Sequence, residues 1–265
     1  MYSGLLHYQQ CALRSHNVHR GISQKKDQQM NDLSNKVAIV TGACTGAAAR
    51  IAQAYAVQGA MVVVNYSTRK EAAQSVVASI VDAGGQAVAI QADVSRIEEV
   101  RRLFDRTEAL FGRPDIVVNS AGCNALHRQS NGANLFCQLL VTGEAVRRFG
   151  LGGGSIINIA ALEDQDAVSS GSVYVSAEGP IDPISLGLSR TLKSRGIRVN
   201  AIAMAAAKRE FAVIGAGAGQ ACNDASESIK RVADAEDNVA QMAVFLASQK
   251  ASYLSGECII MPDSA

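Results

Sequence analysis

The sequence lacks the features that would place it at a membrane or on nucleic acid. None of its apolar runs approaches the roughly 20 residues that a membrane-spanning helix needs, so we expect a soluble protein with no membrane partner. Neither charge dominates, because 25 Lys and Arg residues are balanced by 24 Asp and Glu residues, for a formal net charge of +1. No basic stripe is present either, and nucleic acid is therefore not an expected partner.

Cysteine patterns that build a metal site or a disulfide framework are also missing. The six cysteines form no C-x-x-C pair and are scattered along the chain, at Cys11, Cys44, Cys123, Cys137, Cys222 and Cys258. We interpret them as reduced thiols in a cytoplasmic protein. No metal site is expected.

Acidic residues are scarce in residues 1–31, which contain only Asp27 and lack the apolar core of a secretory signal. A transit peptide has a similar composition, whereas the three histidines of this stretch are too irregularly spaced to favour metal ligation. We expect a disordered extension here. The whole chain has 265 residues, 48% of them apolar, which is enough for one large α/β domain, placed at residues 32–265.

The rest of the chain is organised around residues 37–59. Four apolar residues, 37–40, are typical of a strand buried on both faces of a parallel sheet. Gly42 and Gly46 follow, and apolar residues then recur at helical spacing until Gly59. Strand, glycine turn and helix open a dinucleotide-binding βαβ unit, because the glycines let a phosphate approach and the helix N-terminus supplies free N–H donors.

Apolar runs and helical stretches continue to alternate after this unit, which predicts a right-handed, doubly wound parallel sheet. Strands are expected at 37–40, 60–64, 87–91, 116–119, 155–160, 197–203 and 256–261. Helices are expected from 46 to 58, 70 to 83, 95 to 111, from after residue 136 to 150, and from 235 to 248, with a variable lid over 205–225.

Several motifs resemble those of the short-chain dehydrogenase/reductase family. They are T-G-x-x-x-G at 41–46, N-S-A-G at 119–122, close to the family's N-N-A-G, N-x-x-N-x-F at 131–136, and G-I-R-V-N-A at 196–201. The resemblance covers about residues 33–261. It implies a single Rossmann-type α/β domain with about seven strands in the order 3-2-1-4-5-6-7 and helices on both faces.

The family pattern also implies a nucleotide. After the second strand, the neutral Asn65 with Arg69 nearby favours NADP(H) over NAD(H), unless Arg69 merely faces solvent. Ala48 stands where the family has a further glycine near the pyrophosphate, so binding is expected to be weak. Asp93 would hold adenine, and Ser95 would cap the next helix. The implied cofactor set is Gly42, Cys44, Thr45, Gly46, Ala47, Asn65, Tyr66, Ser67, Arg69, Asp93, Val94, Asn119, Ala121 and Gly122.

The catalytic pattern is degenerate. The family has Ser, twelve residues, Tyr, three residues and Lys, and here Tyr174 is preceded by Ala161 and followed by Glu178 at those positions. A lysine lowers the pKa of the tyrosine, whereas a carboxylate four residues along a helix raises it. Asn131 matches the asparagine that holds a catalytic water. Met204 and Ala205 replace the family's Pro-Gly, so the nicotinamide end has diverged while the adenosine end is kept.

Three functions follow from this degenerate site. The first is non-redox or altered acid–base chemistry on a small carbonyl-containing metabolite, with Tyr174 and Glu178 as proton donor and acceptor. The second is a slow NADP(H)-dependent carbonyl reductase, and the third a non-catalytic subunit or ligand-binding protein. A homo-oligomer would have an altered interface, because residues 123–130 are too few for the helix that relatives place there and Pro180 and Pro183 disfavour a straight helix after Tyr174.

Overall fold

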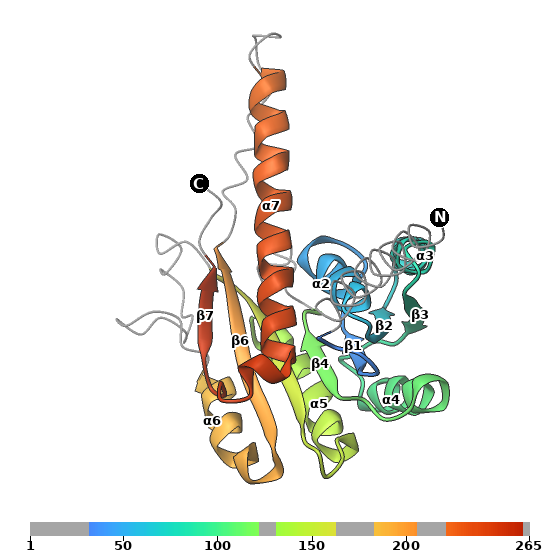
Figure 1. Cartoon of the computed structure of the whole chain (residues 1–265), viewed down its shortest axis with the longest axis vertical. Helices are drawn as coiled ribbons and strands as arrows, with labels where there is room; N and C mark the ends of the chain where they lie inside the picture. The colour runs from blue at the N-terminus through green and yellow to red at the C-terminus, as the bar shows by residue number, and fades with distance from the viewer. Residues whose placement is uncertain (1–31, 122–130, 163–182, 206–220, 262–265) are drawn as a thin grey trace, which may run out of the picture.

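Short apolar runs form the centre of the molecule, a sheet of seven parallel strands (Figure 1). The computed structural model describes residues 32–121, 131–162, 183–205 and 221–261. The strands are β1 Val37–Val40, β2 Met61–Tyr66, β3 Gln86–Gln91, β4 Ile116–Asn119, β5 Gly154–Leu162, β6 Ile197–Ala205 and β7 Cys258–Met261. Their order is β3-β2-β1-β4-β5-β6-β7, and every neighbouring pair is parallel, which confirms the predicted topology.

Helices cover both faces of the sheet, as predicted. They are α2 Gly46–Val57, α3 Lys70–Asp82, α4 Ile97–Phe111, α5 Asn131–Arg148, α6 Pro183–Leu192 and α7 Ala221–Ala247, with short 3₁₀ helices η2 Lys193–Arg195 and η3 Gln249–Ala251. Successive residues of a strand point to opposite faces, so Ala38 and Val40 pack with α2, α3 and α7, while Ile39 packs with α4, α5 and the end of α6. The domain therefore has two apolar cores, one on each side of the sheet.

Helix α7 is longer than the sequence predicted. It begins at Ala221, so residues 221–225, expected in the lid, are helical instead. The reason lies in the composition, because residues 221–247 contain neither glycine nor proline to end a helix. The first part of α7 projects beyond the other elements (Figure 1), and its later part packs on α2.

Two buried contacts fix α7 against α2 and the sheet. The hydroxyl of Tyr55 on α2, a fully buried residue, donates to the carbonyl oxygen of Ala243 at 3.1 Å. The guanidinium of Arg198 on β6 donates to the carbonyl oxygens of Leu246 at 2.7 Å and Ser248 at 3.3 Å, near the end of α7. The bond to Leu246 satisfies one of the last four carbonyls of α7, which have no partner within the helix. The position of α7 along α2 is thereby set.

Helices α4 and α5 are joined by charges instead. Arg148 at the end of α5 contacts Asp105 at 2.7 Å, Glu108 at 2.8 Å and Glu144 at 2.7 Å. Partial burial disfavours the charged guanidinium, but the hydrogen bonds that Arg148 donates to these carboxylates raise its pKa overall. Because the side chain of Glu144 is only 1% exposed, loss of Arg148 would weaken the pairing of a buried carboxylate.

Candidate functional site

The candidate site lies at the carboxyl ends of β1, β2 and β4. Strand β1 pairs with β2 on one side and with β4 on the other, so the strand order reverses here. In open α/β sheets, the crevice outside such a reversal is where ligands bind. Three loops meet at this edge of the sheet. They follow β1, β2 and β4 and comprise residues 41–45, 67–69 and 120–121.

Gly42 allows the loop after β1 to pass very close to the loop after β4. Its φ is +65°, and a methyl group added to it would lie 2.9 Å from the Cα of Ala121. Any side chain would therefore meet backbone. The sequence analysis assigned Gly42 to the approach of a phosphate, and the structure adds a second requirement, the neighbouring loop of the protein itself.

Thr41 holds the same two loops together, although the sequence indicated only that it ends a strand. Its hydroxyl donates to the carbonyl oxygen of Val118 at 3.2 Å and accepts from the N–H groups of Ser120 at 3.0 Å and Ala121 at 3.1 Å. The side chain is 1% exposed. Thr41 thus positions the glycine turn without contacting a ligand.

The N-terminus of α2 is open and lacks compensation from its own residues. Thr45 is the N-cap, but its side chain makes no capping bond, and the first turn contains no acidic residue. Gly46 has φ +67°, and both residues are exposed. Free N–H groups and the positive end of the helix dipole make such a terminus suitable for a phosphate.

Ala48 does not lie where the sequence analysis placed it. Its methyl group is 3% exposed and belongs to the core between α2 and the sheet. The third glycine of this motif serves close packing of helix and strand, and alanine fills that role here. The prediction that Ala48 weakens pyrophosphate binding by direct contact is therefore wrong.

Asn65 is turned into the protein and away from the ribose position. It is 1% exposed, its Oδ1 accepts from the N–H of Gly42 at 3.4 Å, and its Nδ2 donates to the carbonyl oxygens of Ile90 at 3.3 Å and Ala92 at 3.1 Å. The predicted direct contact with the nucleotide is corrected to a positioning role. Asn65 ties the glycine turn to the ends of β2 and β3.

Arg69 is the cation at this edge of the site. It is exposed at the start of α3, and its charge acts on the thiol of Cys44 in the glycine turn. Burial raises the pKa of Cys44, and Arg69 partly opposes that shift. The charge of Arg69 thus acts on Cys44, another member of the predicted cofactor set, and the thiol is expected to stay protonated.

Asp93 and Ser95 form a turn at the end of β3. The Oδ1 of Asp93 accepts from the N–H of Ser95 at 3.0 Å and from its hydroxyl at 2.7 Å, and these bonds lower the pKa of Asp93. Ser95 is not the helix cap, because α4 begins at Ile97 with Arg96 as the N-cap and no capping bond. Glu98 and Glu99 in its first turn compensate the dipole instead.

Asn119 belongs to a buried polar network. Its Nδ2 donates to Asn158 Oδ1 at 2.9 Å and Thr142 Oγ1 at 3.1 Å, and Asn158 in turn donates to Ser185 at 2.7 Å. Asn119 is 2% exposed, so the predicted cofactor contact is replaced by a role in joining β4, β5, α5 and α6. Its Oδ1 is buried without a partner among the described residues.

The remaining predicted cofactor residues divide by exposure. Three of them are buried, namely Ala47, Tyr66 and Val94, so their side chains have little access to a ligand. Ser67 is exposed beside Arg69, and Ala121 is half-buried against Gly42. Gly122 lies outside the described residues.

The predicted catalytic residues are mostly beyond the described structure. Tyr174 and Glu178 lie outside it, and Asn131 is described only as the first residue of α5. The backbone of Ala161 is described and pairs in register with Met204 across β5 and β6. The strand register thus places two substituted positions of the nicotinamide end side by side.

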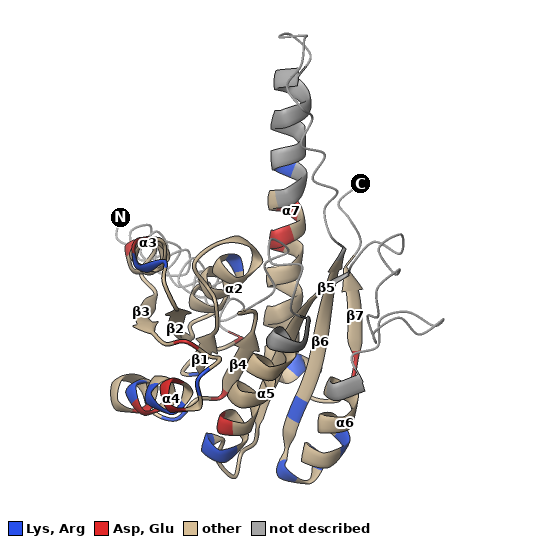
Figure 2. Cartoon of the chain, turned by 180° about the vertical axis from the view of Figure 1, so that it is seen from behind, with Lys and Arg blue, Asp and Glu red and all other residues tan. Residues whose placement is uncertain are grey.

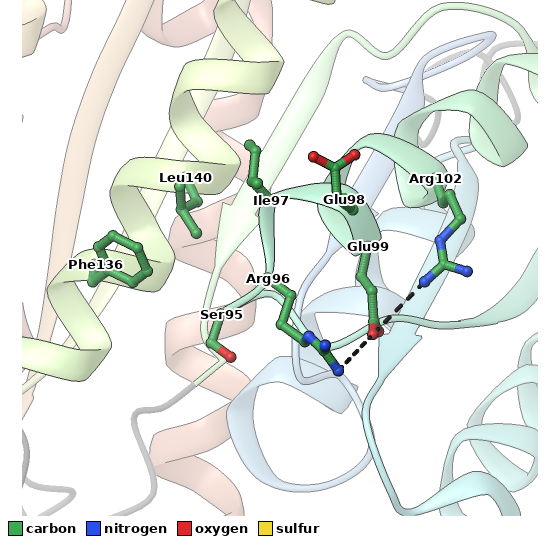
Figure 3. Close-up of a pocket in the computed structure, with 8 residues that line it drawn as sticks. All are labelled: Ser95, Arg96, Ile97, Glu98, Glu99, Arg102, Phe136 and Leu140. Atoms are coloured by element: carbon green, nitrogen blue, oxygen red, sulfur yellow. Dashed lines mark ion pairs between the residues drawn. The ribbon is translucent and has the colours of Figure 1, made fainter.

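A separate hollow of about 600 Å³ lies between the start of α4 and the middle of α5 (Figure 3). Its lining is formed by Ser95, Arg96, Ile97, Glu98, Glu99, Arg102, Phe136 and Leu140. Arg96 and Arg102 both reach Glu99, at 3.6 and 3.7 Å. The hollow therefore borders the turn of Asp93 and Ser95 and holds already paired charges.

Metal chemistry and membrane insertion find no support in the part of the chain that the structure describes. There, no three His, Cys, Asp or Glu residues are grouped as a metal site requires. No helix in the same ranges is long and apolar enough to cross a membrane.

Charged side chains are distributed over the helices and are absent from most of the sheet (Figure 2).

Comparisons with known proteins agree with this fold. The family model described as enoyl-(acyl carrier protein) reductase matches residues 42–262. An uncharacterised oxidoreductase of Methylorubrum extorquens is 35% identical over 242 residues, 87% of this chain and 97% of that protein. A 3-oxoacyl-[acyl-carrier-protein] reductase of Staphylococcus epidermidis is 32% identical over 240 residues, 85% of this chain and 96% of that protein.

A solved structure extends the comparison to a nucleotide complex. The short-chain dehydrogenase of Burkholderia cenocepacia in complex with NADP superposes with a TM-score of 0.66 at 27% identity, over 88% of this chain and 99% of that one. The seven-stranded order, the glycine turn and these matches together lead to one conclusion. This chain belongs to the short-chain dehydrogenase/reductase family.

Proposed function

We propose that this chain is an NADP(H)-dependent oxidoreductase that slowly reduces a carbonyl group of a small substrate. The observation that carries the proposal is the exposed N-terminus of α2, next to the turn of Gly42 and Cys44, with the charge of Arg69 acting on that turn. A pyrophosphate fits the helix terminus, and a 2′-phosphate fits the guanidinium. The names of the reductase relatives support reduction as the reaction class.

The residues of this chain have three roles in that reaction: phosphate binding, selection of the ribose and proton donation. Gly42 and Gly46 present backbone to the phosphates, and Arg69 selects the phosphorylated ribose. When bound, NADPH supplies the hydride that a carbonyl carbon accepts. Tyr174 donates the proton to the carbonyl oxygen, and an alcohol results. Ala161 provides no hydrogen bond to that oxygen, and Glu178 supplies no cation for Tyr174 where the family has a lysine, so the reaction is slow.

A second function is supported by one specific feature, the carboxylate at Glu178 in place of the lysine. Tyr174 and Glu178, four residues apart, form a proton donor and a proton acceptor on one helix face if this segment is helical. Such a pair serves proton transfer on a carbonyl-containing metabolite without net redox change. This alternative consumes no NADPH.

Turnover with NADPH tests both functions. Wild-type protein is incubated with NADPH and a panel of simple ketones and β-ketoesters, and NADPH oxidation is followed by absorbance. We expect slow oxidation that Tyr174→Phe removes and that Tyr253→Phe, at a tyrosine 76% exposed on the surface, leaves unchanged. NADPH binding without oxidation of any substrate would reject the reductase and leave the proton-transfer function to be measured by solvent exchange.

The assembly and location of the protein also stay predictions. We propose a cytoplasmic protein that acts on a small molecule, without nucleic acid as a partner. Any homo-oligomer is proposed to use an interface that differs from that of relatives, because the segment 123–130 is too short for the helix that relatives have there. Sedimentation of the wild-type protein measures its assembly directly.

A further inference from the structure

A carboxylate from α7 lies at the N-terminus of α2. A methyl group built on Gly46 would have Oε1 of Glu236 as its nearest neighbour, at 3.3 Å. Glu236 precedes Val239 and Ala240 by one helical turn, and both of these are 2% exposed in the core that α7 shares with α2. Residues three and four apart share a face, so Glu236 faces α2.

The helix terminus that receives this carboxylate has no anion of its own. The first turn of α2 contains no acidic residue, and Thr45 makes no side-chain cap. Negative charge next to such a terminus is stabilising, whether it comes from a side chain or from a phosphate. Glu236 therefore supplies the kind of charge that a nucleotide pyrophosphate would bring to the same place.

The backbone around Glu236 is held in position. Asp237 forms an ion pair with Arg50 on α2 at 3.5 Å, and the Tyr55 hydroxyl holds α7 at Ala243, about two turns further along. The face of α7 that carries Glu236 therefore stays against α2. A ligand at Gly46 meets the carboxylate unless the side chain alone turns away.

We propose that Glu236 is an affinity-determining residue whose carboxylate competes with the pyrophosphate of NADP(H) for the N-terminus of α2. The proposal rests on the proposed nucleotide binding and goes beyond it, because it assigns weak binding to a residue on another helix. Binding displaces the carboxylate from the helix dipole and adds repulsion between like charges. Removing the charge at residue 236 relieves both effects.

The test compares Glu236→Gln with the matched control Asp234→Asn, which removes the same charge from an exposed side chain of α7. NADPH affinity is measured by calorimetry on the full chain. We expect Glu236→Gln to tighten NADPH binding about threefold to tenfold, as the loss of one nearby like charge implies. Asp234→Asn should leave the affinity within about twofold, as expected for an exposed charge screened by solvent.

Two further readouts separate competition from a general change of charge. Adenosine 2′-monophosphate lacks the pyrophosphate, so its affinity should be the same in wild type and Glu236→Gln. The melting temperature of the ligand-free Glu236→Gln variant should fall by about 1–3 °C, because α2 loses its compensating anion. Saturating NADPH should remove that difference.

Each of the following outcomes would overturn the role of Glu236 or the proposed nucleotide binding. Equal NADPH affinity in wild type and Glu236→Gln overturns the role of Glu236 and leaves nucleotide binding standing. An equal gain with Asp234→Asn, or the same gain for adenosine 2′-monophosphate, also overturns it, because the effect would not arise at the pyrophosphate. Absence of NADPH binding in every variant at millimolar concentration rejects the proposed function and this proposal with it.

Discussion

The two ends of the candidate nucleotide site have been kept to different degrees. At the adenosine end, the glycine turn, the open terminus of α2 and Arg69 stand together as the family pattern implies. At the nicotinamide end, the family pattern predicts that Ala161 and Glu178 stand where a serine would polarise a carbonyl and a lysine would tune the tyrosine. Binding and chemistry are therefore separable on this fold, since each depends on different residues.

Packing explains why the first end is the more durable one. Gly42 is required by the close passage of Ala121, and Thr41 joins β1 to the loop after β4. Substitution at either residue costs stability even in a protein that binds nothing. In the family pattern the serine and lysine positions of the nicotinamide end serve the chemistry, so we expect that their substitution leaves the fold intact.

The largest expected effect comes from bringing the nicotinamide end back to the family pattern. The double variant Ala161→Ser and Glu178→Lys should increase NADPH-dependent ketone turnover by about 10²–10⁴-fold, because it restores a donor for the carbonyl and a cation beside Tyr174. Met204 and Ala205 limit the gain. Steady-state kinetics measure it, with Glu71→Lys on α3 as the charge control. Wild-type turnover equal to that of the double variant would show that Tyr174 needs neither partner.

The adenosine end should respond most to Gly42→Ala. The positive φ and the 2.9 Å approach to Ala121 predict a loss of about 2–5 kcal/mol in the free energy of unfolding and a loss of NADPH binding. Gly84→Ala is the matched control, because Gly84 also has a positive φ, +84°, but open space around it. Gly84→Ala should lower the free energy of unfolding by about 1–2 kcal/mol and leave NADPH binding unchanged. Urea unfolding and calorimetry measure both, and equal costs for the two variants would disprove the close-approach argument.

A smaller effect is expected from Arg69→Ala, which tests the selection of the phosphorylated ribose. NADPH affinity should fall about tenfold, as loss of a charge-assisted hydrogen bond implies, while NADH affinity stays unchanged. Arg101→Ala on α4, whose arginine pairs with Glu98 at 3.1 Å, is the control and should change neither. Calorimetric titration with both nucleotides gives the comparison. An equal loss for NADH would remove Arg69 from cofactor selection.

The smallest effect concerns Asp93, which borders the site. Hydrogen bonds from Ser95 lower its pKa, so their stabilisation is present above the ordinary carboxyl pKa of about 4 and is lost as the pH falls through the lowered value. Ser95→Ala should therefore reduce the free energy of unfolding by only about 0.3 kcal/mol at pH 7, because Asp93 is partly exposed. The difference from wild type should shrink toward pH 3. Ser79→Ala, whose hydroxyl contacts Gln53 and the carbonyl of Val76, should show no such pH dependence.

Local patterns were sufficient for the fold. The apolar runs predicted β1 and β4 at their observed bounds, 37–40 and 116–119. The alternation of strands and helices predicted a doubly wound parallel sheet, and the family resemblance implied its strand order. Gly42 and Gly46 were identified because a glycine turn between strand and helix is a local signal. The length of α7 was missed, since the glycine-rich stretch 215–219 concealed a helix that begins soon after it.

The sequence by itself thus determined the order of elements and the glycine turn, and the substitution of the serine and lysine stays a prediction from it. The tertiary structure decided where the side chains point. Strand β2 is buried on both faces, so no polar alternation indicates that Asn65 turns inward, and the same holds for Asn119 at the end of β4. Glu236 is 190 residues from Gly46 in the chain, and only the packing of α7 on α2 brings its carboxylate to the phosphate turn.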